Sequence, residues 1–545
     1  MAMGDRRELA AFERVDWDEI SEPDAVGVRR GALSALLAGV LALFAYTVFG
    51  GSGTQVPTVD VAARSIRWVT PTPLDVAYVV LAVCYVFLFA LPVVENWSRT
   101  KLRTKLFGVL TTVLGVAFAY DYYYIAPQPT FDSVSIPVYG YLYWDVYGVE
   151  WVFVFSLLVF VCFVLGRLFD DLDRTRTYLS RLRKHPTGAL ALGYVSFFVL
   201  GGAFGNAIVG MPTTFKQVEG SYETFSHQPP VPVWTPFGQT DLFTLVLAAA
   251  IALGVVLAAY NRIDALQRPL ALAATGVVVG LGTLLAVRFT MYEFLEFGPA
   301  IGVSAADSCA GRMTADGCLG TWENPLGTNY VGKGVLPLLF VGFRVSLEVA
   351  LITSMIMLPI ATLVGTFAGY TGGLVDDTLT GYIDIQQTIP AFVAYIVLSH
   401  VFGRSLFLLI LVFGLLSWGG AARLVRSEVV QRREAEFITA ARSAGADDRR
   451  IMRDHVLPNV SNTVLTSVTR RIPMLILAEA AIAYLSLNDI MVISLGESIA
   501  NGLENFPTAW WVSTELTLAL ALTVLSFSLL GDALRDVLDP RGDSQ

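Results

Sequence analysis

Apolar runs of about 20 residues recur along the whole chain and are separated by polar stretches. A run of this length predicts a membrane-spanning helix, because about 20 helical residues cross the hydrocarbon layer of a bilayer. The expected spans lie near residues 32–49, 76–94, 106–120, 151–168, 188–209, 242–260, 269–288, 345–370, 378–400, 405–422, 465–487 and 512–531. The pattern therefore predicts an all-α integral membrane protein with about twelve transmembrane helices.

The distribution of Lys and Arg between the polar stretches predicts the orientation of these spans. If residue 1 is cytoplasmic and the spans alternate, the first four inside segments carry 17 Lys and Arg, and the first four outside segments carry 5. The same alternation places residues 423–458 and the C-terminus inside. We therefore expect a multi-pass protein of the cell membrane with both termini in the cytoplasm. No cleavable signal peptide is expected, because residues 1–27 are acidic and polar.

Composition agrees with a membrane protein and excludes several functions. Hydrophobic residues make up 54% of the chain and charged residues 15%, and the mean hydropathy is +0.60. The formal net charge is −9, and no basic stripe interleaves with aromatic residues, so nucleic acid is not an expected partner. Only four histidines are present. We therefore expect no catalytic site and no metal site in this chain.

Two of the four cysteines share one outside loop, residues 290–343. Cys309 and Cys318 lie nine positions apart on the oxidising side of the membrane. A disulfide between them is a reasonable expectation there. Cys84 and Cys162 lie within expected spans and are interpreted as small apolar residues.

A polar segment between two apolar spans carries small residues at helical spacing. Residues 436–458 read EFITAARSAGADDRRIMRDHVLP. Ala440 and Ala444 fall on one face of the predicted helix, and Ala441 and Gly445 fall on an adjacent face. Gly445 suits the left-handed position after a helix end. The segment is predicted to dock a partner protein, and the alternative is an amphipathic cytoplasmic loop without a partner.

This segment resembles the coupling loop, or "EAA" loop, of permease subunits of ABC importers. The family pattern is Glu-Ala-Ala, three residues, Gly, and later Leu-Pro. The matching residues are Ala440, Ala441, Gly445, Leu457 and Pro458. Thr439 stands where the family has Glu, so an ion pair made by that Glu is lost here or is taken over by Glu436. The resemblance implies that residues 423–458, hereafter the coupling loop, contact an ATPase.

Further motifs resemble dipeptide/oligopeptide (nickel) permeases of the "C" type. Residues 324–347 contain NPLGTN, GKGV and GFRVSL, and residues 530–541 read LGDALRDVLDPR. Asn324, Asn329 and Lys333 stand where the family usually has His, Asp and Arg. The resemblance covers roughly residues 270–545. It implies a type I ABC importer permease core at 266–545, and it assigns no role to the six expected spans of residues 1–265.

The resemblance also implies a function and partners. It implies an importer of di- or oligopeptides, although nickel and oligosaccharides are transported by the same family. The expected partners are a second homologous permease, two ABC ATPase subunits, an extracytoplasmic substrate-binding protein and the lipid bilayer. ATP and Mg²⁺ would be bound by the ATPase subunits, so this chain itself needs no cofactor and is not expected to be an enzyme.

Polar residues inside the expected spans are candidates for the transport pathway, since a charge at the bilayer centre costs about 2.5–3.5 kcal/mol on insertion scales. The candidates are Glu348, Asp384, Gln386, Gln387, Arg470, Arg471 and Glu479. Arg470 and Arg471 would instead lie at the inner interface if their span begins near Ile472. Asp384 and Glu479 would instead join helices as polar locks. Pro390 and Pro473 are expected to kink their spans.

Two readings from other functional classes stay open. About twelve spans would suit a secondary transporter, but the two halves of the chain show no similarity to each other. A non-transporting scaffold or sensor would explain only the unassigned N-terminal region.

Overall fold

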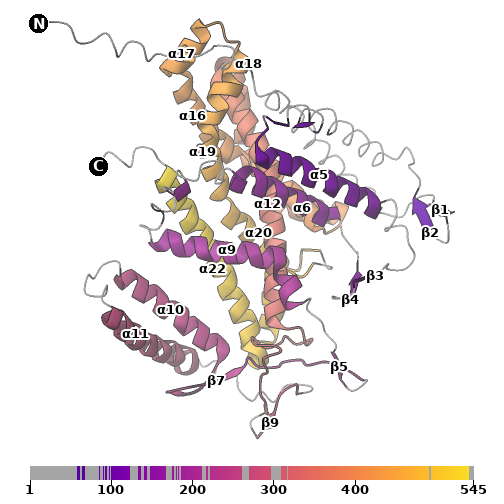
Figure 1. Cartoon of the computed structure of the whole chain (residues 1–545), viewed down its shortest axis with the longest axis vertical. Coiled ribbons are helices and arrows are strands. Elements are labelled where there is room, and N and C mark those ends of the chain that lie inside the picture. The colour runs from indigo at the N-terminus through magenta and orange to yellow at the C-terminus, as the bar shows by residue number, and fades with distance from the viewer. Residues whose placement is uncertain are drawn as a thin grey trace, which may run out of the picture. The chain divides into compact units, whose positions relative to one another are not determined.

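The computed structural model describes residues 101–122, 148–166, 186–210, 221–260, 269–295, 309–315, 317–489 and 492–538, with strand β5 and short pieces between residues 58 and 182. Contacts divide the chain into two compact units, Met1–Leu172 and Asp173–Gln545. Helices dominate both units (Figure 1).

The first unit is described mainly through two helical segments. They are α5 (Leu102–Tyr120) and α6 (Gly148–Val159), which continues as the π-helix η3 (Phe160–Leu165). Phe107 joins them, because its buried ring lies 6.2 Å from Phe155 and 4.9 Å from Phe163. Two antiparallel hairpins accompany these helices, β1 (Thr58–Val61) with β2 (Arg64–Arg67) and β3 (Ser133–Ile136) with β4 (Gly140–Tyr143). The expected span 32–49 lies outside the described residues, and so does most of 76–94.

The second unit contains the remaining elements. Before its longest helix come α9 (Pro186–Val209), β5 (Lys216–Val218), β6 (Ser221–Glu223), β7 (Pro232–Thr235), β8 (Gly238–Asp241), α10 (Leu242–Tyr260), α11 (Pro269–Phe289) with π-helix η5 (Thr290–Phe294), β9 (Met313–Thr314) and β10 (Gly317–Cys318). Then follow α12 (Val335–Thr371), α13 (Gly373–Thr388), α14 (Ala391–Phe402), α15 (Leu406–Leu416), α16 (Gly419–Arg433), α17 (Glu436–Ser443), α18 (Asp448–Arg450), π-helix η6 (Ile451–Val456), α19 (Leu457–Thr469), α20 (Ile472–Tyr484), α21 (Leu495–Glu504) and α22 (Phe506–Leu538).

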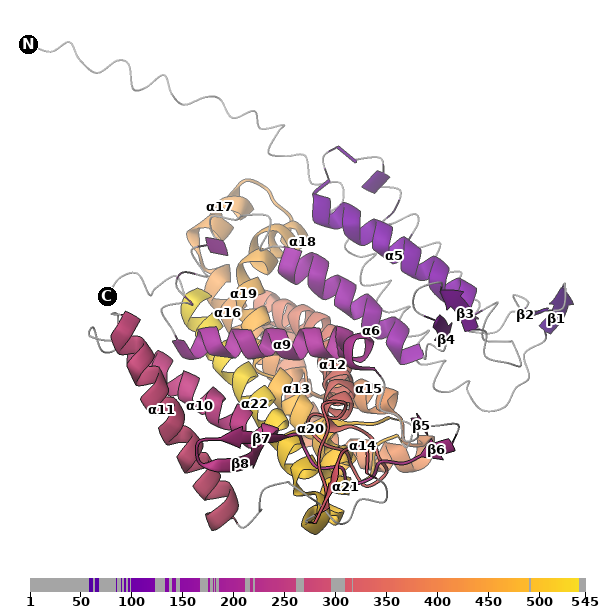
Figure 2. The same ribbon diagram turned by 60° about the horizontal axis from the view of Figure 1, so that its bottom comes forward.

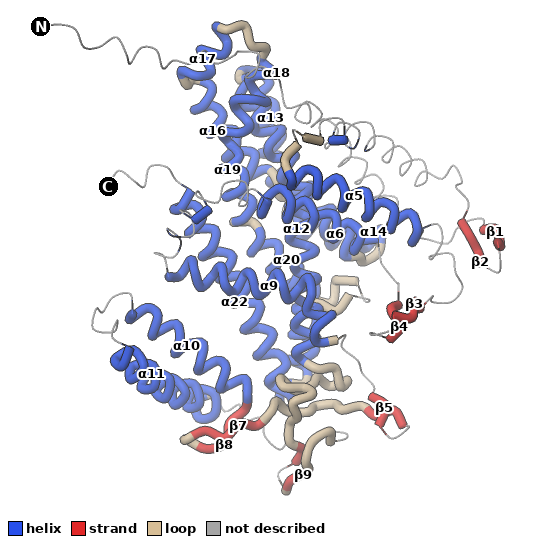
Figure 3. The backbone as a smooth tube through the Cα atoms, in the orientation of Figure 1, coloured by secondary structure: helices blue, strands red, loops and turns tan. Residues whose placement is uncertain are grey.

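The helices are those of a multi-pass membrane protein. Among the described residues, six helical segments are long and apolar enough to cross a membrane, or seven if the bent pair α13–α14 is one span. Three shorter apolar helices coincide with further expected spans, at Gly148–Phe163, Leu242–Val256 and Ile472–Tyr484. The all-α expectation needs one correction, because five two-stranded antiparallel hairpins occupy connections between helices (Figure 3).

Two of the expected spans are interrupted. The chain bends by 68° between α13 and α14, where Pro390 cannot continue the helix, so the predicted kink at Pro390 is confirmed. A turn at Arg470 and Arg471 separates α19 from α20, so the helix begins at Ile472 and not at 465. Pro473 therefore lies in the first turn of α20, where a proline is tolerated, and the expected kink there was wrong.

Helix α9 packs against α12 and α22 in the second unit (Figure 2). Its glycines allow this approach, because a Cβ at Gly205 would lie 2.5 Å from the ring of Phe340. Phe198 is fully buried, with its ring 4.9 Å from Phe343 and 5.5 Å from Phe527. Helix α9, which lies before the predicted domain boundary at 265/266, therefore packs with helices that lie after it.

Thr328 links the segment that contains Phe225 and Gln228 to helix α22 through three hydrogen bonds. The Thr328 hydroxyl donates to Phe225 O over 2.6 Å and accepts from Gln228 N over 2.9 Å. The indole of Trp511 in α22 donates to Thr328 O over 3.2 Å. Cys309 and Cys318 form a disulfide in the same region, with their Cα atoms 5.5 Å apart.

Candidate functional site

The coupling loop folds as a compact helical unit at one end of the second unit (Figure 3). Helix α17 ends with the backbone pattern of a Schellman motif, because Gly445 N donates to Arg442 O over 3.0 Å and Ala446 N donates to Ala441 O over 3.1 Å. Gly445 has φ +84°, a conformation that L side chains rarely adopt. The prediction that Gly445 ends a helix is thereby confirmed.

One side of α17 is buried in an apolar cluster. Ile438 is fully buried, in a cluster whose other members are Tyr370, Val425, Val429, Ile451, Val456, Val460 and Val464. These residues come from α12, α16, η6 and α19, and Ala441 packs against their edge. Ile438 therefore anchors helix α17 to four neighbouring helical elements.

The other side of α17 is open. Glu436, Thr439, Ala440 and Gly445 are exposed, whereas Ala441 faces the apolar cluster. A Cβ at Gly445 would meet no atom within 4 Å, so nothing in the described chain covers this position. Of the four small residues on the two predicted faces, Ala440, Ala444 and Gly445 are therefore open to a partner, and Ala441 packs against the apolar cluster.

A π-helical segment, whose turns are wider than those of an α-helix, connects the coupling loop to α19. Leu457 and Pro458 begin α19 directly after the π-helix η6. Proline lacks the N–H that an α-helical turn would use, and a π-turn is one way in which a helix absorbs the missing bond. Leu457 is partly buried, and Pro458 is exposed.

Polar contacts fasten the coupling loop to the end of α12. The Tyr370 hydroxyl donates to Asp448 Oδ1 over 2.6 Å, and Arg442 Nη2 donates to the Tyr370 hydroxyl over 3.3 Å. This bond to Tyr370 raises the pKa of the Arg442 guanidinium. Within the loop, the Arg453 guanidinium lowers the pKa of the neighbouring Asp454 carboxyl.

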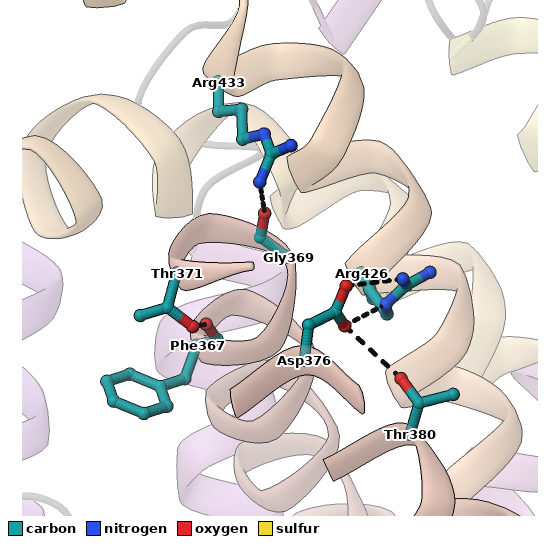
Figure 4. Close-up of polar contacts among 7 residues, drawn as sticks. All are labelled: Phe367, Gly369, Thr371, Asp376, Thr380, Arg426 and Arg433. Carbon is teal, nitrogen blue, oxygen red and sulfur yellow. Dashed lines mark hydrogen bonds and ion pairs between the residues drawn. The ribbon is translucent and has the colours of Figure 1, made fainter. Parts of the chain in front are cut away.

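Helix α16 is fastened to both α12 and α13 (Figure 4). Arg426 binds both carboxylate oxygens of Asp376, with Nη2 and Oδ2 2.6 Å apart. Thr380 donates to the same carboxylate over 3.3 Å, and Arg433 donates to Gly369 O over 3.2 Å. These contacts join α16 to the α12–α13 junction.

Close packing of α12 on α16 depends on two glycines that we did not single out in the sequence. A Cβ at Gly365 would lie 2.5 Å from Ala422 O, and one at Gly369 would lie 2.8 Å from Arg426 O. The signal was present as a Gly-x-x-x-Gly spacing inside an apolar run, which is typical of closely packed membrane helices. No comparable signal marks Tyr370 or Asp448, whose contact joins residues 78 positions apart.

The candidate pathway residues divide into two groups. Glu348 lies on α12 and accepts from Arg344 of the same helix over 3.1 Å, and buried Glu479 of α20 accepts from Ser346 Oγ of α12 over 3.3 Å. The second group surrounds the start of α16. There Asp384 pairs with Arg423, Gln386 Nε2 donates to Leu415 O over 3.1 Å, and Gln387 and Arg471 lie against Gly419 and Gly420. Arg470 belongs to neither group, because it is exposed and lies near Gly531 of α22.

Comparison with known proteins identifies the C-terminal part of the chain. Residues 361–543 match the family described as "Binding-protein-dependent transport system inner membrane component". The oligopeptide transport system permease protein OppC of Haemophilus influenzae is 32% identical over 216 residues, which are 39% of this chain and 70% of that protein. The dipeptide transport system permease protein DppC of Bacillus subtilis is 31% identical over 217 residues, or 39% of this chain and 68% of that protein.

A mycobacterial relative covers a larger share of its own length. The OppC protein of Mycobacterium tuberculosis H37Rv is 33% identical over 223 residues, which are 40% of this chain and 76% of that protein. The coupling loop lies within the residues matched by the family. The chain therefore belongs to the family of inner-membrane components of binding-protein-dependent transport systems.

Proposed function

We propose that this protein is the "C"-type permease subunit of an ATP-driven ABC importer of di- and oligopeptides. The observation that carries the proposal is helix α17, which is held firmly on one side and exposes small residues on the other. The named oligopeptide and dipeptide permeases among its relatives support the substrate class.

The contacts suggest how nucleotide-driven motion would reach the membrane helices. An ATPase subunit would receive the exposed face of α17 around Ala440, while Ile438 holds the opposite face in the apolar cluster. Because Tyr370 and Arg426 link the loop and α16 to α12 and α13, a push on α17 would tilt those helices together. Thr439 is exposed but uncharged, so Glu436 is the acidic residue on α17 available to an arginine of the partner.

The complete importer would contain further proteins. Two ABC ATPase subunits would bind ATP and Mg²⁺, a second homologous permease would supply the other half of the pathway, and an extracytoplasmic protein would deliver substrate. Both termini and the coupling loop would lie in the cytoplasm. The first compact unit would be an addition to the permease core, which begins in this proposal with α9, because α9 packs on α12 and α22.

A secondary transporter is the rival reading. A secondary transporter does not bind an ATPase subunit, so the exposed small-residue face of α17 would lack a partner. An ABC importer requires such a face for its ATPase. Peptide uptake by cells that naturally contain this protein distinguishes the importer from the secondary transporter. Peptide uptake that stops on ATP depletion and persists when ion gradients are collapsed would support the importer.

Substrate identity is tested in the same cells with labelled peptide, nickel and oligosaccharide. Deletion of this chain should abolish uptake of the labelled peptide and leave uptake of nickel and oligosaccharide unchanged. Loss of nickel or oligosaccharide uptake with unchanged peptide uptake would overturn the substrate assignment and leave the importer mechanism standing.

A further inference from the structure

Three helix ends meet in the second unit, and we call the place where they meet the junction. They are the last turn of α13, the start of α16 and the start of α20. A Cβ at Gly419 would lie 2.7 Å from Nε2 of Gln387, and a Cβ at Gly420 would overlap with Nη2 of Arg471. Side chains of α13 and α20 therefore lie directly against the first two residues of α16.

The junction lies inside the membrane-spanning part of the chain. Trp418, which directly precedes α16, packs with Met357 and Ala361 of α12. These two residues lie near the middle of the apolar run 345–370, which is long enough to cross a bilayer. Charged side chains at this depth are costly to place against lipid, and they generally face the protein interior or a water-filled cavity. We therefore expect the junction to face the transport pathway.

Arg471 brings to the junction a positive charge that the described chain does not balance. Its half-buried guanidinium forms no hydrogen bond or ion pair with another described residue. The second arginine near the start of α16, Arg423, is already paired with Asp384. Since an unpaired charge at this depth is unfavourable, the junction is one negative charge short.

Uncharged donors accompany the Arg471 guanidinium. Nε2 of Gln387 lies 3.7 Å from the Cβ position of Gly420, against which Nη2 of Arg471 also lies. Neither α16 nor α20 has a side-chain cap at its start. The first N–H groups of a helix have no acceptor within that helix, and they carry its positive end. In membrane transporters, interrupted helices direct such ends at anionic groups of the substrate.

The buried amide of Gln386 shows that the junction also lacks a hydrogen-bond donor. Gln386 is 4% exposed, and its Nε2 donates to Leu415 O over 3.1 Å. Its Oε1 lies 2.7 Å from the Cβ position of Gly419 and has no partner among the described residues. A ligand that carries an N–H donor beside an anionic group would satisfy both Gln386 and Arg471.

We propose that Arg471, Gln387 and the start of α16 bind the C-terminal carboxylate of the transported peptide. The last residue of a peptide carries a carboxylate and, directly before it, an amide N–H, so it offers both the anion and the donor that the junction lacks. A planar guanidinium can hold a carboxylate through two parallel hydrogen bonds. The phosphate of phosphatidylglycerol offers the anion without the neighbouring N–H. The inference rests on the proposed import of peptides.

Uptake of labelled tri-alanine and of labelled tri-alanine amide tests this site, because the two peptides differ only in the C-terminal carboxylate. The substitutions are introduced into cells that naturally contain this protein. At saturating peptide, Arg471→Gln should lower the uptake rate of tri-alanine about tenfold, as expected when hydrogen bonds to a charged group are lost, and should leave that of the amide unchanged. Arg471→Lys should keep part of the rate, since it retains the charge without the planar fork.

Arg470→Gln is the matched control for these measurements. Arg470 is the preceding residue, it is exposed, and it lies near Gly531 and not in the junction. Its substitution should leave the uptake of both peptides unchanged. Retained uptake of the amide by Arg471→Gln would show at the same time that this variant folds and assembles.

Thermal unfolding of the purified full-length chain in detergent is a second measurement, which does not involve the extracytoplasmic binding protein. All three helix ends belong to this chain, so the purified protein contains the whole junction. Added tri-alanine should raise the midpoint, because a ligand that binds only the folded state stabilises it by mass action. Tri-alanine amide should not raise it. Arg471→Gln should remove the response to tri-alanine, and Arg470→Gln should retain it.

Two results would overturn the carboxylate site and leave peptide import standing. The first is an equal loss of uptake of both peptides in Arg471→Gln, with a midpoint of the unsubstituted protein that does not respond to tri-alanine. The second is phosphatidylglycerol that co-purifies with the unsubstituted protein but not with Arg471→Gln, which would assign Arg471 to a lipid phosphate. Failure of the proposed function is recognised separately, because unsubstituted cells would then take up neither peptide, and the carboxylate site would fall with it.

Discussion

Tyr370 at the end of α12 donates its hydroxyl hydrogen to Asp448 of the coupling loop over 2.6 Å. The ring of Tyr370 is at the same time part of the buried cluster that contains Ile438 of α17. The Tyr370 side chain therefore connects α12 to both α17 and α18 of the coupling loop. We interpret this contact as the step by which motion of the loop reaches α12.

Tyr370→Phe should loosen the loop without unfolding the protein. The ring and its packing are retained, and only the hydrogen bond to a carboxylate is lost, at a cost of about 1 kcal/mol, since Asp448 is exposed. Amide hydrogen exchange across residues 436–450 should become about fivefold faster. Tyr382→Phe is the control, because Tyr382 stacks on Trp418 outside the loop and is exposed. Unchanged exchange in Tyr370→Phe would show that the hydroxyl does not hold the loop.

Gly365→Leu should separate α12 from α16. The built Cβ already lies 2.5 Å from a backbone oxygen of α16, so the added side chain requires a shift of the helix. Overpacking of this kind costs about 1–3 kcal/mol. The unfolding midpoint in detergent should fall. Gly381→Leu is the matched control, because a Cβ at Gly381 meets nothing within 4 Å. Equal midpoints for the two variants would rule out tight α12–α16 packing.

Gly205→Leu tests whether α9 is part of the permease core. A Cβ at Gly205 would lie 2.5 Å from the Phe340 ring, whereas a Cβ at Gly193 on the same helix would meet nothing within 4 Å. Gly205→Leu should therefore lower the midpoint by an amount equivalent to about 1–3 kcal/mol, and Gly193→Leu should not. If both variants melt like the unsubstituted protein, α9 does not pack on α12.

Glu479 distinguishes a polar lock from a pathway residue. It is 2% exposed and accepts a hydrogen bond from Ser346 on α12. Glu479→Ala should destabilise the protein by about 1–3 kcal/mol, because Ser346 would lose its buried partner. Asp384→Ala should have little effect on stability, since the Asp384 side chain is 58% exposed. A Glu479→Ala variant with normal stability and altered uptake would favour the pathway reading.

The sequence predicted the helices well because the bilayer imposes one simple rule on their length. Ten of the expected spans lie wholly or mainly in described parts of the chain, and each coincides with an apolar helix or helix pair. The helix end at Gly445 was predictable for an equally local reason, since one residue type fits a left-handed position.

Contacts between distant residues were not predictable in the same way. The pairing of Tyr370 with Asp448 and that of Asp376 with Arg426 depend on how helices pack, and hydropathy carries no information on the rotation of a helix. The same limitation explains why the orientation of Ala441 was not predicted. The spacing placed Ala441 on one face with Gly445, but Ala441 packs against the cluster that contains Ile438. No motif in the sequence marks the packing of α9 on α12 and α22.

Docking of an ATPase on α17 is the central claim, and Ala440→Arg tests it most directly. The tagged protein would be purified from its own cells in mild detergent, and the accompanying proteins would be identified by mass spectrometry. Ala440 is exposed, so arginine there should block docking without disturbing the fold, and Thr508→Arg adds the same charge at an exposed position of α22 outside the coupling loop. We predict that ATPase subunits and a second permease accompany the unsubstituted protein and Thr508→Arg, and that Ala440→Arg loses the ATPase. Equal recovery of the ATPase with Ala440→Arg, or its absence from the unsubstituted protein in several detergents, would contradict the account.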